Sequence, residues 1–289
     1  MGISMFNSSK RRHRRHHHKT SHNPNTDLHY RIITAESPSS VPAENYRRAK
    51  VSLSFSEIDK KIQVLQINSA TQGEGKTTTL LNLAMTYVED GLKVILIDLD
   101  LRRPKLHRSL KIKNECGVTD VLSGKATLEE AIKHSKWGYD LLNSGTKTSY
   151  PTAQLGSQAI EAMFVELRKN YDMILVDNAP VLSVSDPILI SRLCDAGVFV
   201  VSQAKSRKGV SREAINILRQ NKVPIVGVIF TEISKSNGNY YSYYKYYYES
   251  YYSKTSPIKA VGAQNNSSVT ISEKKDEKPF YPEVEENNK

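Results

Sequence analysis

Short apolar runs alternate with segments of helical periodicity through the middle of the chain. Five of these runs have the length and aliphatic content of strands buried on both faces of a parallel sheet, and they span residues 62–67, 94–97, 173–176, 198–201 and 225–229. Between the first two runs, apolar side chains recur at helical spacing from Leu80 to Val88, and Gly91 follows where a left-handed C-terminal cap is expected. The pattern predicts an α/β fold with a mainly parallel central sheet flanked by helices on both faces.

Local signals indicate further helices around this sheet. Residues 44–54 have a helical pattern ahead of the first strand. Thr127 and Glu130 have the spacing of a capping box, and Asp186 precedes Pro187 at the first position of another predicted helix. These segments supply the helices that such a sheet needs on its faces.

Both ends of the chain lack this alternation. We expect four segments, namely a flexible, basic, His-rich arm over residues 1–40, a folded domain over 41–235, a tyrosine cluster over 236–253 and a flexible polar tail over 254–289. The first 22 residues carry six Lys or Arg and no Asp or Glu, which concentrates the net charge of +11 at one end. Such an arm attracts anionic lipid, nucleic acid or an acidic protein surface, and a solvated tail is an equal alternative. Its histidines form no recognisable metal shell.

Cysteine content and hydropathy limit where the chain works. Cys116 and Cys194 are too few for a disulfide framework. No apolar run approaches the ~20 residues needed to span a bilayer, and the N-terminus has no signal-peptide core. We therefore expect a cytoplasmic chain that does not itself cross a membrane.

The segment from Ala70 to Thr77 matches a phosphate-binding loop. It follows a predicted strand and opens a helix, which is the context that a Walker A motif requires, although Ala replaces the first Gly. Glycines let backbone amides converge on phosphate, Lys76 reaches the outer phosphates, and Thr77 can ligate Mg²⁺. The predicted nucleotide contacts are Gln72, Gly73, Glu74, Gly75, Lys76, Thr77 and Thr78. An accidental Gly-rich turn is the weaker interpretation, because strand and helix stand on either side.

Three aspartates end two of the predicted strands. Asp98 and Asp100 lie at alternate positions and so share a face, while Asp177 ends the next long run and fits the Walker B role. Carboxyl ends of parallel strands meet at the ligand-binding edge of such sheets. The predicted magnesium ligands are Thr77, Asp100 and Asp177, although each aspartate alone could merely cap a helix.

At this point the chain resembles the bacterial tyrosine kinases of capsular and exopolysaccharide synthesis, P-loop NTPases related to cell-division and plasmid-partition ATPases. The resemblance covers about residues 40–252 and is carried by residues 73–77, 98–102, 117–124 and 171–177 together with the tyrosine cluster. It implies an ATP- and Mg²⁺-dependent kinase that phosphorylates protein tyrosines, including those in its own cluster. It also implies a separate transmembrane modulator that keeps the kinase at the inner face of the membrane, a homo-oligomeric ring and a cognate phosphotyrosine phosphatase.

The resemblance also assigns roles to individual residues. The implied catalytic residues are Lys76, Asp98, Asp100, Arg102 and Asp177, and the helix that builds the ring is matched by Glu44, Arg47 and Lys50. Lys replaces Arg at the last ring position and lacks the bidentate fork, unless Arg48 compensates. Other departures from the family pattern are Gln72 instead of Pro, Asn178-Ala179 after the Walker B aspartate, and Thr231 where an adenine-contacting Asn is common.

Nine of the sixteen tyrosines lie in residues 240–252 and are the expected phosphoacceptors: Tyr240, Tyr241, Tyr243, Tyr244, Tyr246, Tyr247, Tyr248, Tyr251 and Tyr252. A neutral tyrosine needs a carboxylate to accept its proton, and Asp98 is the candidate, although the roles of the three aspartates stay open. The cluster could instead stack on nucleic acid or be low-complexity sequence. The main rival function is a partition-type ATPase switch, which often carries a Lys where this chain has Thr71. A specific nucleic-acid binder ranks low, since no recognition module is visible.

Overall fold

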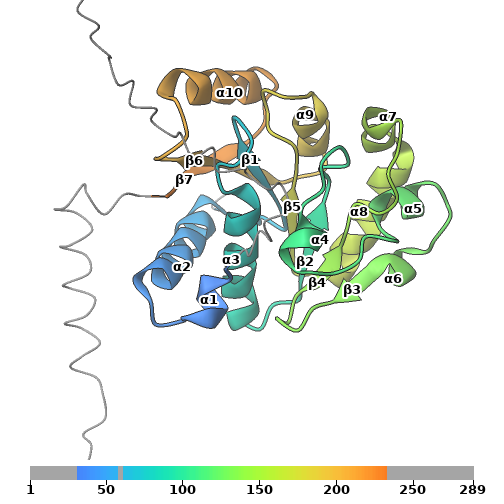
Figure 1. Cartoon of the computed structure of the whole chain (residues 1–289), viewed down its shortest axis with the longest axis horizontal. Coiled ribbons are helices and arrows are strands. Elements are labelled where there is room, and N and C mark those ends of the chain that lie inside the picture. The colour runs from blue at the N-terminus through green and yellow to red at the C-terminus, as the bar shows by residue number, and fades with distance from the viewer. Residues whose placement is uncertain (1–30, 58–60, 233–289) are drawn as a thin grey trace, which may run out of the picture. The chain divides into compact units, whose positions relative to one another are not determined.

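A seven-stranded sheet forms the centre of the protein in this computed structural model, which describes residues 31–57 and 61–232 (Figure 1). The strands are β1 (Val64–Ser69), β2 (Val94–Asp98), β3 (Ile132–His134), β4 (Asp140–Leu142), β5 (Met173–Asp177), β6 (Ala196–Ser202) and β7 (Ile225–Thr231). Their order is β3-β4-β2-β5-β1-β6-β7, and every neighbouring pair is parallel except β3 and β4. The predicted mainly parallel sheet is confirmed, and the five predicted strands are all present.

Helices cover both faces of this sheet, which confirms the predicted α/β class. They are α1 (Ile33–Glu36), α2 (Val41–Ser54), α3 (Lys76–Glu89), α4 (Leu106–Ser109), α5 (Val118–Leu122), α6 (Leu128–Ala131), α7 (Pro151–Leu155), α8 (Gln158–Asn170), α9 (Asp186–Ser191) and α10 (Lys208–Gln220), with a short 3₁₀ turn η1 (Phe55–Glu57) after α2. None of the described helices combines the length and apolar character needed to cross a membrane.

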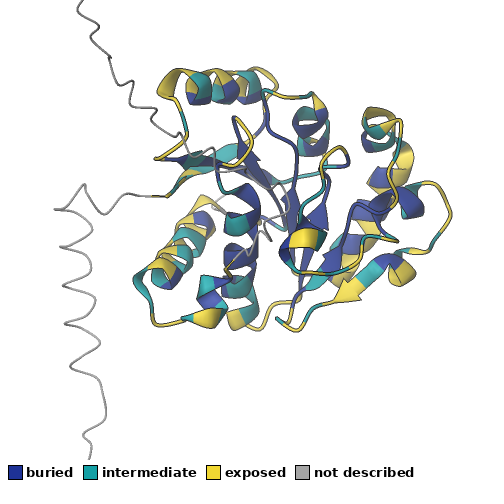
Figure 2. Cartoon of the chain, viewed as in Figure 1, coloured by how far each residue is buried: buried dark blue, intermediate teal, exposed yellow. Residues whose placement is uncertain are grey.

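Alternate residues of the central strands enter two different cores. In β5, Met173 and Leu175 join a cluster beneath α1, α2 and α3, whereas Ile174 and Val176 join a cluster beneath α8 and α9. Successive side chains of a strand point to opposite faces, so a strand covered on both sides is mostly apolar. This explains the apolar runs in the sequence and the buried centre visible in Figure 2, although β1 also buries Gln66 and Asn68.

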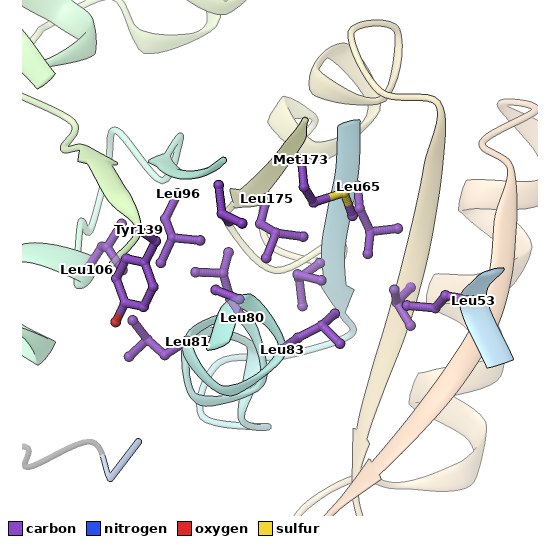
Figure 3. Close-up of a cluster of buried hydrophobic side chains, with 14 of the residues drawn as sticks. Leu53, Leu65, Leu80, Leu81, Leu83, Leu96, Leu106, Tyr139, Met173 and Leu175 are labelled. Carbon is purple, nitrogen blue, oxygen red and sulfur yellow. The ribbon is translucent and has the colours of Figure 1, made fainter. Parts of the chain in front are cut away.

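Helix α3 carries the phosphate loop on its first turn and is fixed by its apolar face. Leu80 and Leu83 are fully buried and face Leu65, Leu96 and Leu175 of the sheet (Figure 3). Burial of each leucine side chain stabilises the fold by about 1.5–3 kcal/mol. The position of the loop relative to the strand ends is therefore set by this packing.

The folded domain begins before the expected boundary at residue 41. Ile32 and Thr34 are buried, and the Thr34 hydroxyl and amide each contact Asn82 Oδ1 of α3, at 3.2 and 3.1 Å. Ser40 then caps α2 by accepting a hydrogen bond from the amide of Ala43. The last part of the expected arm of residues 1–40 is thus ordered, because its few apolar and hydroxyl side chains dock onto α3.

Two predicted helix starts and one predicted helix end are confirmed. Thr127 and Glu130 form the reciprocal capping box of α6, and α9 begins at Asp186 with Pro187 in its first turn. Gly91 follows α3 with a φ of 78°, the left-handed conformation that glycine adopts most readily. Residues 1–30 and 233–289 lie outside the described residues, and with them the tyrosine cluster and the C-terminal tail.

Candidate active site

The phosphate loop connects β1 to α3 and depends on two glycines. Gly73 and Gly75 have φ values of 83° and 98°, a region that side chains with a Cβ atom rarely adopt. A Cβ atom on Gly75 would also lie only 3.2 Å from Thr231. The Thr231 hydroxyl donates to the carbonyl of Glu74 at 2.8 Å, so this departure from the family pattern braces the loop.

Polar side chains from the turn after β6, together with Glu74 of the loop itself, hold the loop in place. The Glu74 carboxylate is buried and accepts hydrogen bonds from the Thr71 amide at 2.9 Å and the Ser206 hydroxyl at 2.5 Å. Lys205 Nζ donates to the carbonyl of Gly73 at 3.1 Å and pairs with Glu232 at 2.7 Å. Glu74, a predicted nucleotide contact, therefore directs its side chain into the protein and can offer a ligand only its backbone.

Lys76 and Thr77 occupy the first turn of α3, where helix amides and dipole favour an anion. Burial lowers the pKa of Lys76, while the nearby charges of Asp177 and Asp100 oppose that shift. The Thr77 hydroxyl donates to Asp177 Oδ2 at 2.6 Å, and burial raises the pKa of Asp177. The structure thus brings together the three predicted residues of the outer-phosphate and metal site.

The residues present fit a magnesium ion. Within the described part of the chain, no three His, Cys, Asp or Glu side chains are grouped to hold a metal by themselves. Thr77 and Asp177 are in direct contact, and Asp100 lines the same cavity. One hydroxyl and one or two carboxylates suit Mg²⁺, which retains waters and takes further oxygen ligands from substrate phosphates.

Asp98 lies beneath the cavity and has a different environment. Its side chain is 0 % exposed. Oδ2 accepts from the amides of Lys105 and Leu106, both at 3.0 Å, and Oδ1 accepts from the amide of Asp100 at 3.1 Å. Burial and the charge of Asp177 raise its pKa to about 8. In this structure Asp98 holds the turn after β2 in place, and it is not among the residues that line the cavity described below.

Asp100 and Arg102 come from the turn that Asp98 holds. Asp100 is half-buried on the cavity wall, and its Oδ1 accepts from the Arg103 amide at 3.0 Å. Arg102 binds Asp186 through two nitrogens, at 2.7 and 3.2 Å, and also donates to the Thr152 hydroxyl at 2.8 Å. Asp186 is only 1 % exposed, so it neutralises Arg102 from the interior. The partner role of Asp186 was not evident from the sequence, where it signalled only a helix start.

A cavity of about 900 Å³ opens above the loop and the carboxyl ends of β2 and β5, a volume within the usual range for small-molecule sites. The predicted residues on its wall are Gln72, Gly73, Gly75, Lys76, Thr77, Thr78, Asp100, Arg102 and Asp177. The wall also contains residues that sequence reasoning missed: Arg31, Arg103, Lys105, Lys205 and Glu232. Four of these side chains are cationic, and cations suit a polyphosphate ligand. Arg103 and Lys105 follow directly after the 98–102 motif, and this closeness in sequence could have indicated that they line the cavity.

A second cavity of about 480 Å³ adjoins the first. Gln72, Arg102, Arg103 and Lys105 line both cavities. The remaining wall comes from the segment around α4 and from the loop after β4, and consists of Leu101, Pro104, His107, Arg108, Asn114, Thr119, Ser144, Gly145, Thr146 and Lys147. The sequence analysis assigned no ligand to this second site, although Leu101, Arg102 and Thr119 belong to the motifs at residues 98–102 and 117–124.

The three residues predicted to build a ring make contacts within the chain. Arg47 forms a two-point ion pair with Glu89 of α3, with both N–O distances at 2.8 Å, and lies 3.4 Å from Glu44. Lys50 Nζ donates to Asp90 at 2.7 Å and to the carbonyl of Thr86 at 2.9 Å. These pairs fasten α2 to the C-terminal end of α3, where cations are favoured by the helix dipole.

Comparison with known proteins places this architecture among relatives. Residues 62–220 match a family model described as an AAA domain. The tyrosine-protein kinase YwqD of Bacillus subtilis is 33% identical over 213 residues, which cover 73% of this chain and 90% of YwqD. The tyrosine-protein kinase CpsD of Streptococcus pneumoniae is 34% identical over 185 residues, 63% of this chain and 82% of CpsD.

Solved structures agree with this comparison. The kinase domain of the Escherichia coli tyrosine kinase ETK superposes with a TM-score of 0.68 at 27% identity, covering 73% of this chain and 83% of that domain. The chimerical protein CapA2B2 gives a TM-score of 0.69 at 27% identity, and the match covers 71% of this chain and 90% of CapA2B2. The septum site-determining protein MinD of Pyrococcus horikoshii, complexed with Mg-ADP, gives a TM-score of 0.50 at 25% identity. That match covers 58% of this chain and 69% of MinD.

Proposed function

Because the chain belongs to the bacterial tyrosine-protein kinase family within the AAA-domain ATPases, we propose that it transfers the γ-phosphoryl group of Mg-ATP to protein tyrosines, including those of its own cluster. The contact of Thr77 with Asp177 in the cavity that contains Lys76 carries this proposal. A phosphate-binding lysine and a hydroxyl–carboxylate pair at one end of a parallel sheet suit phosphoryl transfer.

The residues of the loop would position the nucleotide. Backbone amides from Gly73 to Thr77 and the N-terminus of α3 would bind the phosphates, with Lys76 on the outer ones. Thr77 and Asp177 would hold Mg²⁺, which neutralises charge that develops on the transferring group. Positioning and electrostatic stabilisation supply most of the catalysis in this chemistry.

Proton acceptance from the tyrosine falls to Asp100 in our proposal, in place of Asp98. A tyrosine hydroxyl has a pKa near ~10 and is neutral at physiological pH, so a carboxylate within reach assists its attack. Asp98 accepts backbone amides on both oxygens, and the two oxygens of Asp177 accept from Thr77 and from the Asn178 amide. Among the described residues Asp100 accepts only the Arg103 amide, on Oδ1. Asp100 lies on the cavity wall, and Asp98 acts by holding it there.

Regulation by partners rests on the family resemblance. We propose a separate transmembrane modulator that holds the kinase at the inner face of the membrane, a ring of subunits, a phosphotyrosine phosphatase that reverses the reaction, and a role in capsular or exopolysaccharide synthesis. For the ring, Glu44, Arg47 and Lys50 would have to exchange their present partners on α3 for those of a neighbouring subunit, or contribute through their exposed parts.

A partition-type ATPase switch is the second candidate function, and the likeness to MinD with Mg-ADP favours it. Both functions use the same phosphate loop and metal site, but they differ in the acceptor of the phosphoryl group. Water would be the acceptor in the ATPase, whereas a tyrosine hydroxyl would be the acceptor in the kinase.

Incubation of purified protein with Mg-ATP distinguishes the tyrosine kinase from the ATPase. We expect phosphotyrosine by antibody and mass spectrometry, and its loss in Lys76→Ala and Thr77→Ala. It should be retained in the control Lys208→Gln, an exposed residue of α10 that lines neither cavity. Release of inorganic phosphate from ATP without any phosphotyrosine would support the ATPase. Phosphotyrosine that persists in Lys76→Ala made away from other kinases would refute the proposed site.

A further inference from the structure

The second cavity is strongly cationic and lies directly beside the nucleotide cavity. Five side chains on its wall are Lys or Arg, namely Arg102, Arg103, Lys105, Arg108 and Lys147. No Asp or Glu is among the described residues that line it. A group bound there would therefore experience a positive field next to the proposed site of phosphoryl transfer.

Four of these five cations have no carboxylate partner within the described residues. Only Arg102 is paired, through its contact with buried Asp186. Arg103, Lys105, Arg108 and Lys147 form no ion pair in the part of the chain that the structure describes. His107 also lines the cavity, but burial and the charge of Arg108 lower its pKa, so at neutral pH it adds little positive charge. An anionic ligand would supply the negative charge that these cations lack.

The floor of the cavity is a rigid polar loop. Asp120 of α5 is buried and accepts from the amide and hydroxyl of Thr146, at 2.9 and 2.6 Å. Asn114 donates to the Ser144 hydroxyl at 2.9 Å and accepts from the Gly145 amide at 2.9 Å. These bonds hold the loop before Lys147 in one conformation. The 117–124 motif packs against this loop through backbone hydrogen bonds from Val118 and Thr119, and Thr119 lines the cavity.

Resting on the proposed kinase function, we propose that the second cavity is a docking subsite for acidic side chains that flank an acceptor tyrosine. The two cavities share the wall formed by Arg103 and Lys105, so a peptide with its tyrosine at the γ-phosphate can place neighbouring residues in the cationic cavity. Carboxylates are opposite in charge to this wall, and they can accept hydrogen bonds from both Arg and Lys.

The chain itself contains a sequence of this kind outside the tyrosine cluster. Tyr281 is followed within five residues by Glu283, Glu285 and Glu286, whereas residues 240–252 contain a single acidic residue, Glu249. The proposal therefore adds Tyr281 as a phosphoacceptor, presented in trans to the cavity of another copy. It also predicts that other protein substrates carry acidic residues close to the modified tyrosine.

Peptide binding tests the docking subsite without any catalytic step. A fluorescent peptide of residues 276–289 is titrated with full-length protein, beside the same peptide with the three glutamates after Tyr281 changed to Gln. The test variant is Arg108→Gln with Lys147→Gln, whose side chains are exposed and line only the second cavity. The matched control is Lys208→Gln with Arg212→Gln, two exposed cations on α10.

We expect the test variant to bind the acidic peptide about three- to tenfold more weakly, the range for losing two exposed charge pairs. The control variant should match the wild type, and the Gln peptide should bind weakly to all three proteins. Equal binding of the two peptides, or equal weakening in both variants, would overturn the proposal.

Kinase assays then separate docking from catalysis. With the wild type, the acidic peptide should have a lower KM than its Gln counterpart, and the test variant should raise that KM while kcat and the KM for ATP stay unchanged. Mass spectrometry should find phosphate on Tyr281. Peptide binding without any phosphorylation would contradict the proposed kinase function and leave the acidic docking subsite supported; phosphorylation without a preference for the acidic peptide would contradict the subsite alone.

Discussion

Asp98→Asn separates a positioning role for this residue from a role as base. At pH 5 the wild-type carboxyl is protonated, and both of its oxygens can still accept backbone amides. Asparagine retains one oxygen for the Lys105 and Leu106 amides, but its NH₂ group cannot accept from the amide of Asp100 and faces it as a second donor. A buried donor left without an acceptor costs about 1–3 kcal/mol. We therefore expect the free energy of unfolding to fall by about this amount at pH 5, measured by urea denaturation.

The sign of the pH dependence follows from the raised pKa of Asp98. Its pKa is about 8 in the folded chain and about 3.9 when unfolded. The stability linked to the protonated carboxyl is present below the unfolded value and declines as pH rises towards the folded value. Since Asn cannot ionise, the difference in unfolding free energy between wild type and Asp98→Asn should shrink between pH 5 and pH 8.

Activity provides the decisive comparison with Asp100→Asn. Loss of a proton acceptor lowers kcat by about 10²–10⁴-fold, which we expect for Asp100→Asn with little change in stability. Folded Asp98→Asn at saturating Mg-ATP should keep a larger share of kcat than Asp100→Asn. If Asp98→Asn were the more damaging change while remaining folded and binding ATP normally, our assignment of the base would be wrong.

Three further changes test the fold around both cavities. Leu80→Ala removes a fully buried side chain beneath the phosphate loop and should lower the free energy of unfolding by about 2–5 kcal/mol in a urea titration. Gly145→Ala would place a Cβ atom 2.3 Å from Asp120 Oδ2 at a φ of 83°, so we expect a lower melting temperature and weaker binding of the acidic peptide. Burial opposes ionisation of Asp120, but hydrogen bonds from Thr146 and Gly117 lower its pKa overall. The resulting stability is present above the unfolded pKa of about 3.9 and is lost as pH falls through the lower folded value, so Asp120→Asn should show a shallower acid-induced decline in unfolding free energy than the wild type.

The turn after β2 connects these experiments. Asp98 fixes its backbone, Asp100 faces the nucleotide cavity, and Arg103 and Lys105 lie on the wall between the two cavities. Arg102 ties the same turn to Asp186 at the start of α9. One short segment thus sets the relation between the nucleotide site and the proposed peptide site, and substitutions in it should affect both.

The local patterns in the sequence were sufficient for the five long strands, for α3 and for the phosphate loop. Strands buried on both faces are mostly apolar, and the loop needs glycines, Lys76 and Thr77 at fixed spacing, so the evidence lies within a few residues. The strands β3 and β4 were missed because three residues carry too little pattern, and their pairing depends on contact with β2.

Only the tertiary structure distinguished the roles of the aspartates. Asp98 and Asp100 are two positions apart, yet one is covered by the amides of Lys105 and Leu106 and the other faces the cavity. Arg102 meets Asp186 across 84 positions of sequence. The second cavity likewise joins the turn after β2 to the loop after β4. Residue type and spacing identify groups able to bind phosphate or metal, but burial and long-range contacts determine which of them face a ligand, because those depend on how distant segments pack.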